Sequence, residues 1–314
     1  MPEKKRIAVT MGDAAGIGPE VIVKSIGTIS KYCLPVIVCD GAFLKAQARK
    51  FKADISGAKI CDMKNIKAPI KPARVSAPAG RAAYEYIVEA VSQALVEDVS
   101  AVVTAPINKE SFSRAGVKFP GHTELLAKLT GTREFAMMLC GVGLRVVLVT
   151  THAALKDVPE LITKEEIVSK IGLAAEYLRD GLKIKRPRIG VAGLNPHAGD
   201  GGIFGAEERN IILPAVKSAG RKFGQSVITG PVAPDALFYK AKRGDFDAVV
   251  CMYHDQGLVA LKMEAFEEGV NVTLGLPIIR TSPDHGTAFD IAGKGKANPR
   301  SFIEAVKLAV RLAR

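Results

Sequence analysis

The sequence lacks tryptophan, and aromatic residues make up only 6% of its 314 positions. Proteins that hold single-stranded nucleic acid stack its bases on aromatic side chains, so this scarcity disfavours that class. No apolar run approaches the ~18–20 residues of a membrane-spanning helix. No apolar segment typical of a signal peptide precedes the first strand-like run. We therefore expect neither a membrane protein nor a nucleic-acid-binding protein.

Cysteine is also scarce: there are five, an odd number, and none forms a C-x-x-C pair. This argues against a disulfide framework or a zinc ribbon and favours the reducing cytoplasm as the compartment. The sequence has no Walker A, G-x-S-x-G or H-E-x-x-H motif, and Gly16–Val21 lacks the third glycine of G-x-G-x-x-G. A standard Rossmann nucleotide site is therefore disfavoured.

Basic residues are in excess, with 44 Lys and Arg against 32 Asp and Glu and a formal net charge of +12. A basic protein attracts anions. Because the basic residues are spread along the chain, phosphorylated small molecules are better candidate ligands than nucleic acid.

Short apolar runs alternate with stretches of helical spacing. The predicted strands are Ile7–Thr10, Pro35–Cys39, Ala101–Thr104, Val146–Thr150, Arg188–Ala192, Ala248–Cys251 and Val270–Leu274. The predicted helices are Ala82–Leu95, Thr123–Leu129, Lys164–Leu182, Gly205–Ala219, Pro234–Lys242 and Ser301–Ala313. Such continuous apolar strands suit a sheet covered on both faces. Their alternation with helices indicates an α/β protein with a mostly parallel sheet.

All five histidines follow predicted strands or lie in loops rich in Gly, Pro and Asp, where ligands gather in open α/β sheets. Three of them, His152, His197 and His254, could hold Zn²⁺ or a similar metal as neutral imidazoles. The nearby Asp200 and Asp255 could accept hydrogen bonds from the rings. From spacing alone, the plainer interpretation of structural or surface histidines stays open.

Two glycine motifs indicate ligand contacts near helix starts. The glycines of Gly12–Glu20 allow a close backbone approach, and Pro19 and Glu20 suit the first turn of a following helix. In Gly121–Glu124, Thr123 is a natural N-cap, and the N–H groups behind it could hold a phosphate. A simple tight turn and simple helix capping remain the alternatives.

Other polar residues stand in apolar or glycine-rich surroundings, among them Lys262 and Asn271. Arg280, after an apolar stretch, is either paired or clamps a phosphate or carboxylate. The segment Asp284–Pro299 is rich in glycine and leads into the last predicted helix. Taken by itself, it is a long surface connection.

Taken in order, these motifs resemble the PdxA family of 4-hydroxythreonine-4-phosphate dehydrogenases in vitamin B6 biosynthesis. The resemblance runs almost end to end and includes Gly12–Glu20, Thr104–Lys109, Gly121–Glu124, Thr151–His152, Asn195–Gly199, Met252–Gly257, Gly269–Thr273 and Arg280–Ser282. Each motif alone is weak, whereas the ordered set is specific. Ala14 departs from the family, which usually has proline there, and this bears on the rigidity of the loop.

The resemblance implies a two-domain α/β fold like that of isocitrate and isopropylmalate dehydrogenases, with mostly parallel sheets and an active-site cleft between the domains. By analogy, residues 1–115 with 275–314 form the first domain, and residues 116–274 form the second, which carries a dimer interface.

The resemblance also implies one divalent metal per subunit, such as zinc, cobalt or magnesium, held by His152, His197 and His254. One of these ligands is implied to come from the partner subunit of a homodimer. The implied substrate contacts are His122, Thr123, Lys262, Asn271 and Arg280.

The segment Asp284–Pro299 is similar to the adenosine-binding loop of the β-decarboxylating dehydrogenases. The implied cofactor contacts are Gly16, His285, Asp290 and Asn298. The counterpart of Asp290 receives the ribose hydroxyls in those enzymes. Because a carboxylate there would repel a 2′-phosphate, we expect NAD as the cofactor in preference to NADP.

The implied reaction is NAD-dependent oxidation of 4-phosphooxy-L-threonine at C3, followed by decarboxylation to 3-amino-2-oxopropyl phosphate. Lys262, Asp255 and Asp235 are the candidate bases. One alternative is a paralogue that oxidises 4-phospho-D-erythronate or 4-phospho-D-threonate in sugar-acid catabolism. A non-catalytic phosphometabolite-binding protein is the other, but it would not explain three metal-type histidines in a chain with an adenosine-type loop.

Overall fold

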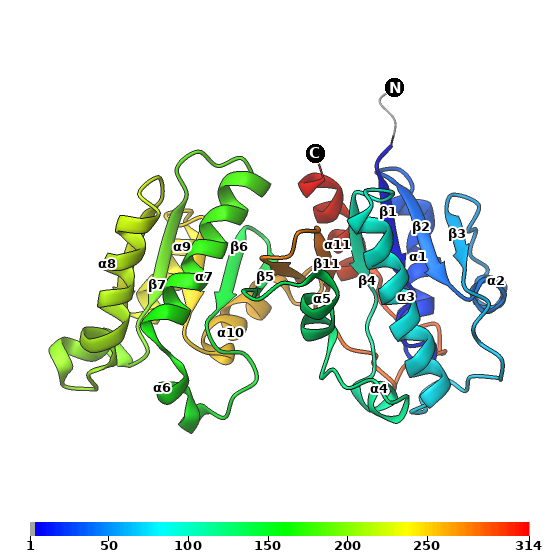
Figure 1. The fold of residues 1–314 in the computed structure, drawn as a ribbon, viewed down its shortest axis with the longest axis horizontal. Coiled ribbons are helices and arrows are strands. Elements are labelled where there is room, and N and C mark those ends of the chain that lie inside the picture. The colour runs from blue at the N-terminus through cyan, green and yellow to red at the C-terminus, as the bar shows by residue number, and fades with distance from the viewer. Residues whose placement is uncertain (1–3, 314) are drawn as a thin grey trace. The chain divides into compact units, whose positions relative to one another are not determined.

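A computed structural model describes residues 4–313, and no helix within that range is long and apolar enough to cross a membrane. The chain divides into two compact units, Met1–Arg133 with Leu276–Arg314, and Glu134–Gly275. Figure 1 shows the two units, with the ribbon coloured from blue at the N-terminus to red at the C-terminus. The expected domain ranges, 1–115 with 275–314 and 116–274, stay a prediction.

The first unit is a parallel sheet with helices on both faces. Its strands are β1 Arg6–Thr10, β2 Leu34–Cys39, β3 Lys59–Asp62, β4 Ala101–Thr104 and β11 Arg280–Pro283, in the order β3-β2-β1-β4-β11. Its helices are α1 Gly18–Ile29, α2 Gly41–Lys50, α3 Ala77–Leu95, α4 Lys109–Arg114, α5 His122–Thr130 and α11 Arg300–Leu312. Helix α3 packs on β1, β2 and β4, whereas α11 packs on β4 and β11 and against α1.

The second unit has the same layered construction. Its strands are β5 Ala136–Gly141, β6 Leu144–Leu148, β7 Arg188–Ala192, β8 Val227–Val232, β9 Ala248–Cys251 and β10 Val270–Leu274, in the order β10-β5-β6-β9-β7-β8. Its α-helices are α6 Val158–Leu161, α7 Lys164–Glu176, α8 Leu213–Lys222, α9 Pro234–Lys242 and α10 His254–Ala265. Shorter helical turns span Leu155–Asp157, Tyr177–Gly181, Pro196–Gly202 and Glu208–Ile212.

Apolar strands account for the core of each unit. In the first unit, Ile7, Ala8 and Val9 of β1 are fully buried, as a strand covered on both faces requires. In the second, Val249 and Cys251 of β9 lie in an apolar cluster with Leu258 of α10. Strand β5 is antiparallel to both β6 and β10. The pairs β6 with β9, β9 with β7 and β7 with β8 are parallel, so the predicted α/β class with mostly parallel sheets is confirmed.

Candidate active-site residues in each unit

Three adjacent parallel strands of the first unit end at one edge of its sheet. Thr10 of β1 lies opposite Thr104 of β4, and β11 runs beside β4 in the same direction. The segments Met11–Ile17, Ala105–Asn108 and Asp284–Pro299 therefore leave the sheet side by side. This is the edge where ligands bind in open α/β sheets.

The loop after β1 is shaped by close backbone contacts. Gly12 has a φ of +71°, and a Cβ atom on it would stand 2.4 Å from the carbonyl oxygen of Pro106. The next residue, Asp13, donates its N–H to that same oxygen at 2.9 Å. Only glycine combines this conformation with this approach. The loop is thereby fixed against the segment that follows β4.

Asp13 is a candidate functional residue that the sequence interpretation did not single out. Its side chain is buried, Oδ1 accepts the N–H of Ala15 at 2.8 Å, and Oδ2 is buried without a hydrogen-bond partner. Burial raises the pKa of Asp13 above its ordinary value, although the Ala15 hydrogen bond opposes this. A turn motif alone does not show burial, so nothing in the sequence separated Asp13 from its neighbours.

Gly16 brings the first loop onto the segment Asp284–Pro299, which we call the glycine-rich loop. A Cβ on Gly16 would stand 2.8 Å from Thr287 Cβ, and the N–H of Ile17 donates to the Thr287 carbonyl at 3.0 Å. The two segments that the resemblance assigns to the cofactor therefore touch.

The expected cofactor residues of the glycine-rich loop have different surroundings. His285 has a buried Nε2 without a hydrogen-bond partner, and burial lowers the pKa of its imidazole. Asp290 is exposed. Asn298 is exposed too, but its Oδ1 accepts the N–H of Arg300 at 3.0 Å. Among these three residues, Asp290 therefore offers an exposed carboxylate that the hydroxyl groups of a ligand can reach.

Arg280, which is buried, and His122, which is partly buried, are interacting polar groups of the first unit. The Arg280 side chain donates to Thr104 Oγ1 at 2.6 and 3.2 Å, and burial lowers the pKa of its guanidinium to about 10. His122 has a buried Nε2 without a hydrogen-bond partner. Burial, and then the charge of Arg280, hold the pKa of His122 well below its ordinary value. A charged guanidinium beside a neutral imidazole suits a phosphate or carboxylate.

Thr123 does not cap its helix as the sequence suggested. Helix α5 begins at His122, its N-cap is Gly121, and no side chain closes its first turn. Thr123 is partly buried in that turn, next to His122. The N–H groups of the turn are therefore not occupied by a side-chain cap.

The three predicted metal ligands follow three adjacent strands of the second unit. His152 follows β6, His254 follows β9 and His197 follows β7, and β9 lies between the other two. The rings of His152 and His254 have centroids 6.1 Å apart. Within residues 4–313 no three His, Cys, Asp or Glu side chains converge as a metal-binding group. The fold therefore brings the rings of His152 and His254 close together. His197 does not join them in a metal-binding group.

His254 is oriented by its neighbour. Its Nδ1 lies 2.7 Å from Asp255 Oδ1, the arrangement expected of an acceptor that holds a ligating ring. Asp200, the other expected acceptor, lies in the His197 segment, where all five residues of 197–201 have positive φ values.

The His197 segment is held by carboxylates from the next helical turn. Glu208 is buried and accepts the N–H groups of Leu194 and Asn195, both at 2.7 Å. The Asn195 side chain donates to Glu208 at 3.0 Å and to Glu207 at 2.8 Å. The strained backbone at His197 is thus supported from outside, as strained functional segments are.

The remaining predicted site residues of the second unit lie on separate elements. Asp235 is in the first turn of α9. Lys262 is in the last turn of α10, with Nζ 5.9 Å from the centre of the Phe266 ring. Asn271 is on β10, and its Oδ1 is buried without a hydrogen-bond partner. Such an amide oxygen is a position where a ligand donor would be favourable.

Comparison with known structures first defines the class of fold. The chain is similar to isocitrate dehydrogenase from Methylococcus capsulatus, with a TM-score of 0.51 and 14% identity, covering 98% of this chain and 85% of that one. The expected fold type, shared with this dehydrogenase, is therefore confirmed. A much nearer structure is 4-hydroxythreonine-4-phosphate dehydrogenase from Klebsiella pneumoniae, with a TM-score of 0.90, 42% identity, and coverage of 100% and 99%.

Sequence comparison then gives the family. Residues 31–309 match the model of the pyridoxal phosphate biosynthetic protein PdxA, and the chain belongs to this family. It is 47% identical to 4-hydroxythreonine-4-phosphate dehydrogenase of Desulfosudis oleivorans, over 99% of this chain and 96% of that protein. It is also 47% identical to D-threonate 4-phosphate dehydrogenase of Cupriavidus necator, over 98% and 97%.

Proposed function

We propose that the protein oxidises 4-phosphooxy-L-threonine at C3 with NAD and releases 3-amino-2-oxopropyl phosphate and CO₂, a step of vitamin B6 biosynthesis. The observation that carries this proposal is the 47% identity, over nearly the whole of both chains, to a protein named 4-hydroxythreonine-4-phosphate dehydrogenase. The buried guanidinium of Arg280 and the buried Nε2 atom of His122, both in the first unit, support an anionic substrate.

The anionic groups of the substrate are assigned to polar residues of the first unit. Arg280, His122 and Thr123 offer a guanidinium, an imidazole and an uncapped helix start to the phosphate or carboxylate. In the second unit, the predicted substrate contacts Lys262 and Asn271 offer a cation and an amide. Arg280 is the main determinant of anion binding, because its guanidinium is buried and is already oriented by its hydrogen bonds to Thr104.

Cofactor binding is assigned to Gly16 and the glycine-rich loop. Gly16 keeps the loop after β1 close to Thr287. His285 and Asn298 flank the dinucleotide, and the exposed carboxylate of Asp290 accepts hydrogen bonds from the adenosine ribose. The same carboxylate disfavours a 2′-phosphate, so we expect NAD to be used in preference to NADP.

A divalent metal suits the histidine pair of the second unit. The rings of His152 and His254 are close, and Asp255 contacts Nδ1 of His254, which directs Nε2 of that ring toward a ligand. Imidazole donors suit Zn²⁺ or Co²⁺ and suit Mg²⁺ less well. When bound, the metal would polarise the C3 hydroxyl and stabilise negative charge after CO₂ loss. His197 would complete the set from the partner subunit of a homodimer.

An exposed apolar face on α10 supports the homodimer. Val259, Met263 and Phe266 are 58%, 83% and 75% exposed, and their spacing places them on one side of the helix. Val142, which is 65% exposed, follows Gly141, and a Cβ on Gly141 would stand 2.5 Å from Ala265 Cβ. Such a patch is typical of an interface.

The residues of the chain orient the reaction and move its proton. Bound NAD would supply the oxidising group: its nicotinamide C4 would take the hydride from C3 of the substrate, which oxidises the alcohol to a ketone and reduces NAD to NADH. The hydroxyl proton passes to a base, for which Lys262 and Asp235 are candidates; Asp255 is the third, although its Oδ1 is engaged by His254. The resulting β-keto acid would then lose CO₂, and the enolate that remains would take back the proton from the base at C2 to give the ketone product.

A second candidate function is the oxidation of 4-phospho-D-threonate or 4-phospho-D-erythronate. The chain is 47% identical to a D-threonate 4-phosphate dehydrogenase, which favours this function. Its identity to the 4-hydroxythreonine-4-phosphate dehydrogenase named above is the same. The same phosphate, metal and NAD residues would serve both reactions.

The proposed chemistry is tested by following NADH absorbance with 4-phosphooxy-L-threonine, before and after chelation and metal restoration. We expect turnover with NAD that a chelator abolishes and added Zn²⁺ or Co²⁺ restores. Turnover that resists complete removal of metal would contradict the metal assignment, and a clear preference for NADP would contradict the role of Asp290.

A further inference from the structure

The glycine-rich loop has no helix or strand of its own, although it links β11 to α11. It starts where Asp284 donates its N–H to Ser301 Oγ at 3.0 Å. Near its start, the carbonyl of Thr287 accepts the N–H of Ile17. Gly293 and Gly295 both have a φ of +74°. A segment of this kind needs external contacts to hold one conformation.

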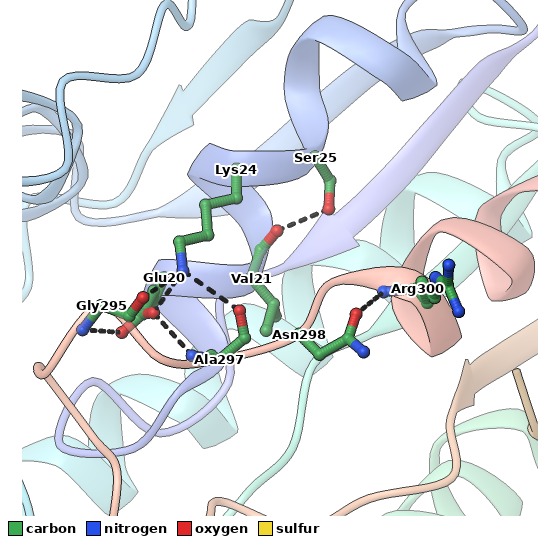
Figure 2. A network of polar contacts seen from close by, with 8 residues as sticks. All are labelled: Glu20, Val21, Lys24, Ser25, Gly295, Ala297, Asn298 and Arg300. Atoms are coloured by element: carbon green, nitrogen blue, oxygen red, sulfur yellow. Dashed lines mark hydrogen bonds and ion pairs between the residues drawn. The ribbon is translucent and has the colours of Figure 1, made fainter. Parts of the chain in front are cut away.

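An ion pair on α1, formed by the buried Glu20 and the partly exposed Lys24, supplies those contacts to the second half of the loop. Glu20 accepts the N–H of Ala297 at 2.8 Å and that of Gly295 at 3.2 Å. Lys24, one turn later, donates to the carbonyls of Gly295 and Ala297 at 2.8 and 3.1 Å. The two side chains are joined at 2.7 Å. Figure 2 shows both reaching from α1 to the passing chain.

The pair binds all four backbone polar groups of Gly295 and Ala297. Glu20 is only 2% exposed, and a buried carboxylate is costly unless it is paired and hydrogen-bonded. Here it has three donors, so its charge is well compensated. An apolar pair of equal size would leave the N–H and C=O groups of the loop unsatisfied.

We propose that Glu20 and Lys24 are positioning residues for the dinucleotide. They fix Gly295 and Ala297 so that Asn298 and Asp290 are held in a binding conformation before the cofactor arrives, which lowers the ordering cost of binding. This inference rests on the proposed function, since it assumes that the glycine-rich loop binds NAD.

The test uses the full-length protein with Glu20→Gln, which keeps the side chain's shape and removes its charge. Lys24→Met is the second variant, because it removes the donor to both carbonyls and would still be informative if Glu20→Gln failed to fold. The matched control is Glu166→Gln, which breaks a pair of the same spacing whose carboxylate is 51% exposed, Lys170 with Glu166 at 2.9 Å.

We expect Glu20→Gln and Lys24→Met to raise the Kd and KM for NAD about tenfold. The kcat and the KM for the phosphorylated substrate should stay within about twofold of the unaltered protein, as should every constant of Glu166→Gln. Hydrogen exchange in residues 284–299 should accelerate in the two test variants without cofactor, and not in the control.

Three outcomes overturn the inference in distinguishable ways. Unchanged NAD binding in both test variants would refute the positioning role and leave the proposed function intact. Equal losses in kcat and in affinity for both substrates, with unchanged exchange in residues 284–299, would show general damage. If the unaltered protein neither binds nor reduces NAD, the proposed function fails, and this inference fails with it.

Discussion

The imidazole rings of His152 and His254 lie with their centroids 6.1 Å apart, although they follow strands that are distant in the sequence. The register of the sheet explains this, since Leu148 near the end of β6 lies opposite Cys251 at the end of β9. Two residues that leave adjacent parallel strands at the same edge must come close. His197 leaves β7 at that edge but is not grouped with them.

If His197 completes the metal set in the partner subunit, then two inactive variants should complement each other. His197→Ala and His254→Ala homodimers should each lose turnover and bound metal. After mixing, unfolding and refolding in equal amounts, about half of the dimers are hybrids. Each hybrid has one intact site, so we expect about a quarter of the unaltered activity. No recovery, with hybrids demonstrated by native mass spectrometry, would contradict the shared site.

Replacing Arg280 by lysine should impair substrate binding although the positive charge is kept. Lysine cannot reproduce the planar fork that donates to Thr104 and to an anion at once. We expect kcat/KM for the phosphorylated substrate to fall about a hundredfold, with the loss mainly in KM. Arg114→Lys, in an exposed helical ion pair, is the control. A change of less than threefold in Arg280→Lys would argue against the anion site.

His122 should make the fold less stable in mild acid. Its pKa in the folded protein is held below the ordinary 6.5, chiefly by burial. The unfolded chain therefore binds a proton more readily, and stability is complete above about pH 6.5 and falls as the pH drops below it. His122→Gln removes this contribution. We expect the loss of unfolding free energy between pH 7.5 and 5.5, measured by urea denaturation, to be smaller in the variant; equal losses would contradict the assignment.

Gly12 should tolerate no side chain. Gly116 has a similar φ of +76° but open space around it, whereas a Cβ on Gly12 would meet Pro106. Left-handed strain alone should cost ~1–2 kcal/mol in Gly116→Ala. Overpacking should add about 1–3 kcal/mol in Gly12→Ala. Denaturant unfolding of both variants measures the difference between their losses of unfolding free energy. Equal losses would show that the loop after β1 shifts to accommodate the added Cβ atom.

Much of the fold could be predicted from the sequence because continuous apolar strands alternate with amphipathic helices. The predicted strand Ala101–Thr104 has the bounds of β4, and Pro19 and Glu20 do lie in the first turn of α1. Strand β5, with two methionines and a cysteine in six residues, lacks the β-branched signal and was not predicted. Neither was β11, which begins with the buried Arg280.

The candidate site was predictable only in part, because single residues do not show which distant groups they meet. The order of the motifs along the chain, and the family resemblance that it carries, predicted the histidines and Arg280 as site residues. Nothing in the local sequence indicates that Glu20 would contact Gly295 and Ala297 near the other end of the chain. The buried state of Asp13 is equally invisible in a turn motif. Long-range pairing and burial are properties of the folded chain.

The most direct test of the account is the kcat/KM for three substrates, measured as NADH formation with the metal-loaded protein and accompanied by CO₂ release. The account predicts that 4-phosphooxy-L-threonine is preferred over 4-phospho-D-threonate and 4-phospho-D-erythronate, with one CO₂ released per NADH. Turnover of the latter two alone would contradict the proposed place in vitamin B6 biosynthesis and assign the protein to sugar-acid catabolism.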